Sequence, residues 1–209
     1  MNKISLSIAM LFVCMAGFSQ EKESKPAKVR GSYFNIGYVN SKLNQDEIGK
    51  IENDWGAFFA TGKTFYLHKK PILNFIKFGI DATWFDLSYS QYKLETLWDE
   101  ETFHHAEASM HVGPSVTFTP VNGLNISGYF RYAPTFSAIY STANNYSLGY
   151  ATRFVGGASL SYKVFGVGFE SRFGKSDLEP FNVLLDEDGE GDKVSTRLTG
   201  FRVYITFRY

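Results

Sequence analysis

Residues 104–111 hold the densest group of side chains in this sequence that could do chemistry: His104, His105, Glu107, Ser109 and His111. In an extended strand, residues two apart point the same way, so positions 105, 107, 109 and 111 would share one face. Imidazole, carboxylate and hydroxyl groups are those of a hydrolase or a metal site. A row on one strand does not converge, however, and no second strand offers an obvious partner for a catalytic relay. The sequence therefore predicts no catalytic site, no metal and no other cofactor.

A second candidate is the acidic run Asp186-Glu-Asp-Gly-Glu-Gly-Asp192. Asp186, Asp188 and Glu190, followed by Gly191, match the start of a calcium-binding loop. The match ends at the twelfth position, where Arg197 stands in place of the bidentate glutamate that such loops require. We expect a solvated acidic loop, with a weak divalent-cation contact as the alternative.

A third set consists of charged residues that each lie among small polar neighbours. These are Lys77, Asp81, Glu107, His111, Arg131, Arg153, Glu170, Arg172 and Arg202. Whether they meet depends on the elements that carry them.

Segments in which apolar and polar residues alternate continue to the end of the chain and predict strands. The clearest is the last one, in which Phe201, Val203, Ile205, Phe207 and Tyr209 share one face. Similar segments lie near residues 33–38, 76–84, 107–118, 124–132, 150–162 and 167–173. An eighth strand is expected between Trp55 and His68. Its register stays open, because Lys63 falls on the face of Phe59 and Phe65 unless a bulge near Gly62 resets the phase.

The connections between these segments alternate in length. Residues 69–73, 120–123 and 163–165 are short, whereas residues 42–54, 91–103, 139–149 and 176–195 are long and mostly polar. Short turns at one end and long loops at the other are typical of a transmembrane β-barrel. The sequence thus predicts an all-β fold: a single eight-stranded antiparallel up-and-down transmembrane β-barrel, with both of its termini at the short-turn end.

The volume of the barrel predicts which face points out. An eight-stranded barrel has an interior just wide enough for side chains to fill, so the apolar faces, which are rich in Phe and Tyr, should point outward. A soluble monomer rarely exposes such a surface, which therefore indicates contact with lipid. The opposite face, with Gly, Ser, Thr and the charged set, should fill the lumen. Buried charges are usually paired, so we expect the charged set to form an ion-pair network that plugs the barrel.

Residues 1–20 are predicted to be a secretory signal: Lys3 precedes an apolar stretch that is too short to span a bilayer as a helix. Residues 21–30 are predicted to be a flexible lead and residues 31–209 the barrel. Cys14, the only cysteine, would leave with the signal. Basic and acidic residues balance at 21 each, so no overall basic charge points to nucleic acid.

From Gly31 to Tyr209 the chain resembles the small outer-membrane β-barrel family of the OmpA/OmpX type. The terminal run from Phe201 to Tyr209 carries this resemblance best, because it is similar to the C-terminal signal that the outer-membrane assembly machinery reads. Many such proteins end in Phe, so Tyr209 is a mild departure. The resemblance implies a location in the cell outer membrane, with outer-membrane lipid, lipopolysaccharide and the assembly machinery as partners.

We therefore expect an integral outer-membrane protein with a structural, adhesion or partner-binding role. Aromatic and apolar side chains of the long loops could bind an external partner; these are Tyr89, Tyr92, Leu97, Trp98, Tyr140 and Tyr146. One alternative is a barrel enzyme that modifies lipid A, as a deacylase or acyltransferase. The other is a soluble periplasmic barrel that binds a ligand.

Overall fold

The computed structural model describes residues 29–45, 49–95, 100–141, 146–176 and 196–209. The predicted signal at residues 1–20 and most of the predicted lead lie outside this part. The described residues form nine strands: β1 (Ser32–Gln45), β2 (Gly49–Glu52), β3 (Trp55–Tyr66), β4 (Ile76–Glu95), β5 (Glu100–Phe118), β6 (Leu124–Ser141), β7 (Tyr146–Tyr162), β8 (Phe165–Ser176) and β9 (Thr196–Arg208). Within these ranges, no helix is long and apolar enough to cross a membrane.

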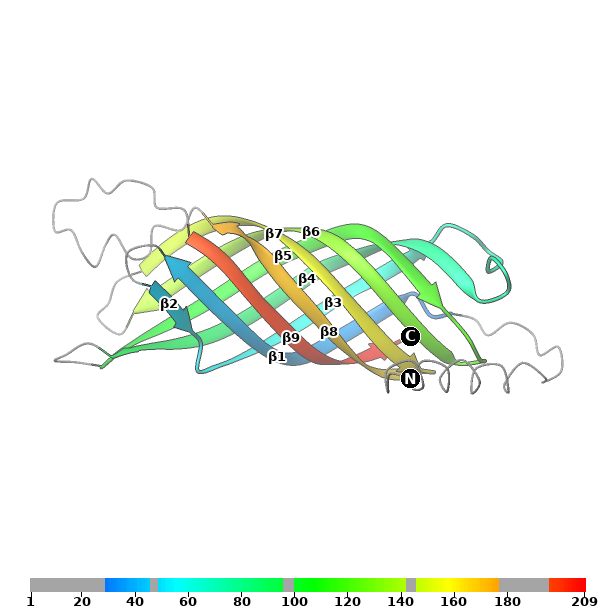
Figure 1. Cartoon of the computed structure of the whole chain (residues 1–209), viewed down its shortest axis with the longest axis horizontal. Helices are drawn as coiled ribbons and strands as arrows, with labels where there is room; N and C mark the ends of the chain where they lie inside the picture. The colour runs from blue at the N-terminus through cyan, green and yellow to red at the C-terminus, as the bar shows by residue number, and fades with distance from the viewer. Residues whose placement is uncertain (1–28, 46–48, 96–99, 142–145, 177–195) are drawn as a thin grey trace, which may run out of the picture.

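Eight of the strands close into a barrel (Figure 1). Each strand pairs antiparallel with the next, and β1 pairs with β9 from Tyr33 opposite Arg208 to Asn44 opposite Arg197. The short strand β2 lies outside this ring and pairs only with the end of β1. The eight-stranded up-and-down barrel predicted from alternation is confirmed.

The strand whose register the sequence left open is β3. Its residues alternate without interruption, so Lys63 does point outward on the face of Phe65, with its ammonium 5.4 Å from the ring centroid. No bulge resets the phase of β3 at Gly62.

The irregularity lies in the neighbouring strand, β4. Thr61 of β3 pairs with Phe85 and Gly62 pairs with Thr83, which leaves Trp84 as an extra residue. The same offset appears against β5. Because of this bulge, Trp84 and Phe85 both point outward, and the inward positions change from odd to even numbers. Asp86 is therefore brought into the lumen.

The three short turns occur where they were predicted, but strands occupy part of three predicted long loops; the fourth, 176–195, lies outside the described residues except for Ser176. Much of 91–103 and 139–149 continues the hairpins β4–β5 and β6–β7, and 42–54 contains β2. The strands of these two hairpins have 17 to 20 residues, whereas β3, β8 and β9 have 12 or 13. The hairpins β4–β5 and β6–β7 therefore extend further along the barrel axis than the other strands.

The side chains face as the volume argument predicts. Large apolar side chains on the outer surface are 37 to 77 % exposed, among them Ile36, Phe78, Trp84, Leu87, Val112, Phe130, Phe154, Phe169, Val203 and Ile205. The inner surface is mostly polar and buried. Three inward tyrosines, Tyr33, Tyr129 and Tyr204, each lie opposite a glycine on the next strand. A Cβ at Gly168, for example, would lie 2.2 Å from the ring of Tyr204, so the glycine makes room for the ring.

Candidate functional site

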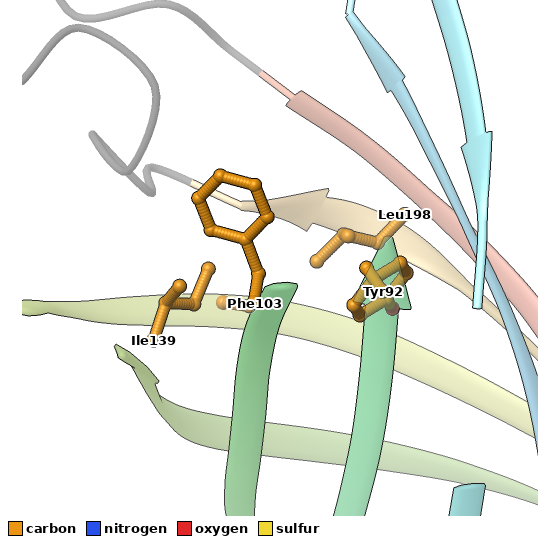
Figure 2. Close-up of a cluster of buried hydrophobic side chains, with 5 residues drawn as sticks. Tyr92, Phe103, Ile139 and Leu198 are labelled. Atoms are coloured by element: carbon orange, nitrogen blue, oxygen red, sulfur yellow. The ribbon is translucent and has the colours of Figure 1, made fainter. Parts of the chain in front are cut away.

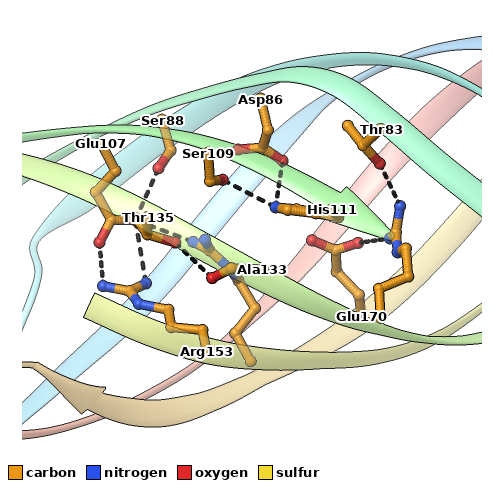
Figure 3. Close-up of polar contacts among 12 residues, drawn as sticks. Thr83, Asp86, Ser88, Glu107, Ser109, His111, Ala133, Thr135, Arg153 and Glu170 are labelled. Carbon is orange, nitrogen blue, oxygen red and sulfur yellow. Dashed lines mark hydrogen bonds and ion pairs between the residues drawn. The ribbon is translucent and has the colours of Figure 1, made fainter. Parts of the chain in front are cut away.

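The lumen holds two groups of ion pairs that connect different walls of the barrel. Figure 3 shows the first group around Glu107, and Asp86 and Glu170 of the second. In the first, Glu107 of β5 receives Arg153 of β7 on both oxygens. Arg172 of β8 donates to Oε2 of Glu107 at 3.0 Å, and the hydroxyl of Ser88 donates to the same oxygen at 3.0 Å. One buried carboxylate thus binds two guanidinium groups and a hydroxyl.

The second group is a chain of alternating charges. Arg202 of β9 reaches across the tube to Asp86 of β4 with two parallel contacts of 2.6 and 3.1 Å. Arg202 also donates to Glu170 at 3.3 Å. Arg131 contacts the other carboxylate oxygen of Glu170 at 2.8 Å and Asp81 at 3.2 Å, so it links these two carboxylates.

Hydroxyl groups and rings complete this second group. Asp81 accepts hydrogen bonds from Tyr33 and Thr64, each at 2.7 Å. The guanidinium of Arg131 lies 3.9 Å from the ring centroid of Tyr129, and that of Arg202 lies 4.2 Å from the ring of Phe58. Carboxylate partners and aromatic faces together offset the cost of removing these charges from water.

Eight of the nine residues predicted for this network lie in the lumen and are nearly fully buried. Lys77 does not join them: it lies near the short-turn end, with its ammonium 5.1 Å from the ring centroid of Tyr66. The main residue that the prediction missed is Asp86, which the bulge in β4 turns inward. The adjacent bulky residues Trp84 and Phe85 were the sequence signal for that bulge, because they break the alternation.

The row from His105 to His111 also points into the lumen, and a second strand does supply a carboxylate, contrary to the prediction. His111 Nε2 lies 2.8 Å from Ser109 Oγ and 3.8 Å from Asp86 Oδ2. Both contacts are made to the same ring nitrogen, whereas a relay needs one partner on each nitrogen. Nδ1 of His111 is buried without a hydrogen-bond partner. The three side chains are 2 to 6 % exposed, so a substrate would not reach them.

Apolar side chains close the lumen toward the long-loop end (Figure 2). Tyr92, Phe103, Ile139, Ala151 and Leu198 form a cluster in which every side chain is buried. Tyr92 was predicted to be an exposed loop residue, but it lies inside the barrel, 3 % exposed. The prediction failed because β4 continues through this position to Glu95.

Little space remains deeper in the barrel. A cavity between Tyr33, Asp81, Arg131 and Arg208 has a volume of about 10 Å³, room for at most one water molecule. The lumen is therefore plugged at mid-height by paired charges and toward the loops by apolar side chains.

Of the other predicted loop residues, Tyr89 and Tyr140 lie on the outer wall, where they stack on either side of His104 with centroid distances of 5.9 and 6.4 Å. Trp55 extends this row, 5.2 Å from Tyr89. Beside the row, small residues (Ala57, Ala106, Ala108, Ala138 and Gly149) line an apolar groove of about 650 Å³. Leu97, Trp98 and the acidic run 186–192 lie outside the described residues, as does the side chain of Tyr146.

The surface assigns the barrel to a membrane. The outer surface of the barrel is an apolar band and its inner surface is polar. A soluble protein has the opposite arrangement, whereas an outer-membrane barrel has this one. Hydrogen-bonded strands closed into a ring leave no free edge, as lipid requires. The row of Trp55, Tyr89, His104 and Tyr140 occupies the level of an interfacial aromatic girdle.

No family model and no curated protein matches this chain. Among solved structures, the chain is similar to Neisserial surface protein A, with 11% identity over 86% of this chain and 97% of that one and a TM-score of 0.45. It is also similar to Ail of Yersinia pestis in complex with a heparin analogue, with 12% identity, 87% and 100% covered, and a TM-score of 0.48. A third is the outer membrane protease OmpT from Escherichia coli, with 8% identity, 91% and 99% covered, and a TM-score of 0.49.

These identities are too low to carry a role from any of the three proteins to this chain. The location follows from the two surfaces of the barrel itself, one suited to lipid and the other filled with paired charges. The chain is an integral outer-membrane protein built as one eight-stranded transmembrane β-barrel with a plugged polar lumen.

Proposed function

We propose that this protein is a non-conducting, non-enzymatic barrel that anchors two projecting hairpins at the cell surface for adhesion or partner binding. The observation that carries the proposal is the filled lumen. Arg202 and Asp86 join opposite walls, and Arg153 and Glu107 join two more strands. With the apolar cluster near the loops, these contacts support a lumen that is closed to ions and to soluble substrates.

The lengths of the strands support a display role. At about 3.3 Å per residue and a tilt of about 40°, the 20 residues of β4 rise about 50 Å along the barrel axis, whereas the 12 residues of β8 rise about 30 Å. The apolar band of such barrels is about 25 Å tall. The hairpins β4–β5 and β6–β7 therefore project beyond the membrane and offer strand surface to a partner.

Single-channel recording in planar bilayers tests the plugged lumen. We expect no stepwise conductance from the refolded protein under conditions in which a 16-stranded porin, as positive control, opens. Discrete opening events that scale with the amount of protein would contradict the proposal.

A shortened hairpin tests the display role. Lys93 pairs with Thr102, so residues 94–101 can be replaced by Asn-Gly, a two-residue turn that suits this register. We expect cells that make the shortened protein to adhere less to host-cell and matrix-coated surfaces than cells that make the full protein. A third strain, in which Asn-Gly replaces residues 142–145 between β6 and β7, tests the other hairpin in the same way. Equal adhesion of all three strains would contradict display by β4–β5.

The rival function, modification of lipid A, is tested by mass spectrometry of lipid A from cells with and without the protein. We expect an identical acyl pattern. A change in the number of acyl chains would replace the proposal with an enzymatic one, acting at a site other than the buried Ser109 and His111.

We also propose that the outward residues of β9, together with Tyr209 directly after it, are the signal for the assembly machinery. Phe201, Val203, Ile205, Phe207 and Tyr209 all lie on the lipid-facing side. We expect Tyr209→Lys to reduce the folded fraction in cells and to leave refolding in detergent unchanged. Equal losses in both settings would indicate a stability effect instead.

We propose that lipopolysaccharide is the lipid that surrounds the half of the barrel near the long loops. Native mass spectrometry of protein extracted from outer membranes should detect lipopolysaccharide bound to the protein.

A further inference from the structure

The balanced charge of the chain hides a strong difference between the two ends of the barrel. The long-loop segments 42–54, 91–103 and 175–197 contain fifteen acidic and six basic residues. The short-turn segments 62–77, 118–124 and 162–166 contain five lysines and no acidic residue. Arg30 lies at the same end, just before β1.

These cations surround the short-turn mouth. Arg30, Lys63 and Lys163 line a half-polar cavity of about 850 Å³ at this mouth, together with Tyr162 and Tyr209. Lys69 and Lys70 lie exposed in the turn between β3 and β4. The described residues of these short-turn segments include no Asp or Glu that could pair with the cations.

Outward-facing aromatic rings hold two of the lysines at the rim of the short-turn end. The ammonium of Lys63 lies 5.4 Å from the ring centroid of Phe65, and that of Lys163 lies 5.2 Å from the ring of Tyr162. The ammonium of Lys77 lies 5.1 Å from the ring centroid of Tyr66, but these two side chains are on the inner wall of the barrel at this end. A lysine over an interfacial ring keeps its carbon stem against apolar surface and extends its charge toward the headgroups.

We propose that this end is a binding surface for anionic phospholipid headgroups of the leaflet that faces the periplasm. We call it the cationic collar: Arg30, Lys63, Lys69, Lys70 and Lys163. Outer-membrane barrels place their short turns on the periplasmic side, so the collar meets the phospholipid leaflet. The acidic long-loop end would repel the same headgroups. The proposal rests on the membrane location and is independent of the display role.

The attraction should be large enough to measure. A cation near an anionic membrane surface contributes about a fivefold preference for the anionic lipid, and salt weakens it. Removing three lysines of the collar should therefore reduce the preference by one order of magnitude or more.

The test uses the full barrel refolded in vesicles of phosphatidylcholine with a minor fraction of phosphatidylglycerol. Spin-labelled lipids give the association constant of phosphatidylglycerol relative to phosphatidylcholine from the motionally restricted signal. We compare the parent with Lys63→Gln/Lys69→Gln/Lys163→Gln and with the matched long-loop variant Lys42→Gln/Lys93→Gln/Lys175→Gln. Heat-modifiable migration in gels verifies that each variant is folded.

We expect the parent to prefer phosphatidylglycerol, with a preference that falls as salt is added. The collar variant should lose most of this preference, and the long-loop variant should keep it. Two results would overturn the proposal: a parent without preference for the anionic lipid, or equal losses in the two triple variants, which would assign the effect to net charge.

Discussion

The contact between Arg202 and Asp86 gives the sharpest test of how the lumen is held together. Arg202 is fully buried, and Asp86 is 2 % exposed. Replacing Arg202 by Gln removes two short contacts to the carboxylate and leaves Asp86 in a site that water does not reach. The nearest cationic candidate that remains is His111, at 3.8 Å.

Removing one partner of a buried ion pair costs about 3–5 kcal/mol, because the other charge stays buried without compensation. We expect Arg202→Gln to lower the free energy of unfolding by this amount. Asp86→Asn should cost less, because Arg202 keeps its contact to Glu170 at 3.3 Å. The double variant removes both charges, so its cost should be smaller than the sum of the single costs by about 2 kcal/mol or more.

Urea unfolding in phospholipid vesicles, followed by tryptophan fluorescence, measures these costs. Trp55 and Trp84 are about half exposed on the outer surface and report on their lipid environment. Lys175→Gln, an exposed change, is the control and should have little effect. Additive costs in the double variant, or single costs below about 1 kcal/mol, would refute a plug held by this pair.

Two further changes test the facing of side chains and the packing of the lumen. Phe130 is 47 % exposed and stacks on Phe154, so Phe130→Arg should cost about 2–4 kcal/mol or block insertion. Tyr140→Arg, in the interfacial aromatic row, should cost about 1 kcal/mol or less in the same unfolding assay. Equal costs would contradict the facing. Gly168→Val would place a side chain into the Tyr204 ring and should lower the free energy of unfolding by about 1–3 kcal/mol. Adding Tyr204→Ala should restore part of the lost stability. A Gly168→Val protein as stable as the parent would contradict this packing.

The bulge in β4 shows where alternation is sufficient and where it fails. Before the bulge, even-numbered Ile80 points outward and odd-numbered Asp81 points inward, as alternation predicts. After the bulge the order is reversed: odd-numbered Leu87 points outward and even-numbered Ser88 points inward. The alternating segment predicted from the sequence ended at Trp84, so Asp86 was not assigned to either face of the strand. The change of phase could have been recognised from Trp84 and Phe85, because two large apolar residues in succession do not fit a half-buried strand.

The ends of the strands show a second kind of failure. The polar character of residues 91–103 predicted a loop, yet β4 runs to Glu95 and β5 begins at Glu100. A strand that extends past the apolar band of a barrel needs no apolar residue on its outer face. Tyr92 and Phe103 face each other across this extension and are buried by Ile139 and Leu198 from other strands. No pattern within one segment shows this, because the cluster depends on side chains brought together by closure of the barrel.

The sequence by itself determined the class of fold, the number of barrel strands, the face that meets lipid and most of the residues in the lumen. It could do so because a two-residue period and a narrow tube leave one arrangement for a chain so rich in Phe and Tyr. The tertiary structure alone decided the partners: Arg202 with Asp86, and Arg153 and Arg172 with Glu107. Pairing across a lumen depends on the relative height of strands that are not neighbours, which is set by register and by one extra residue in β4 rather than by any local pattern.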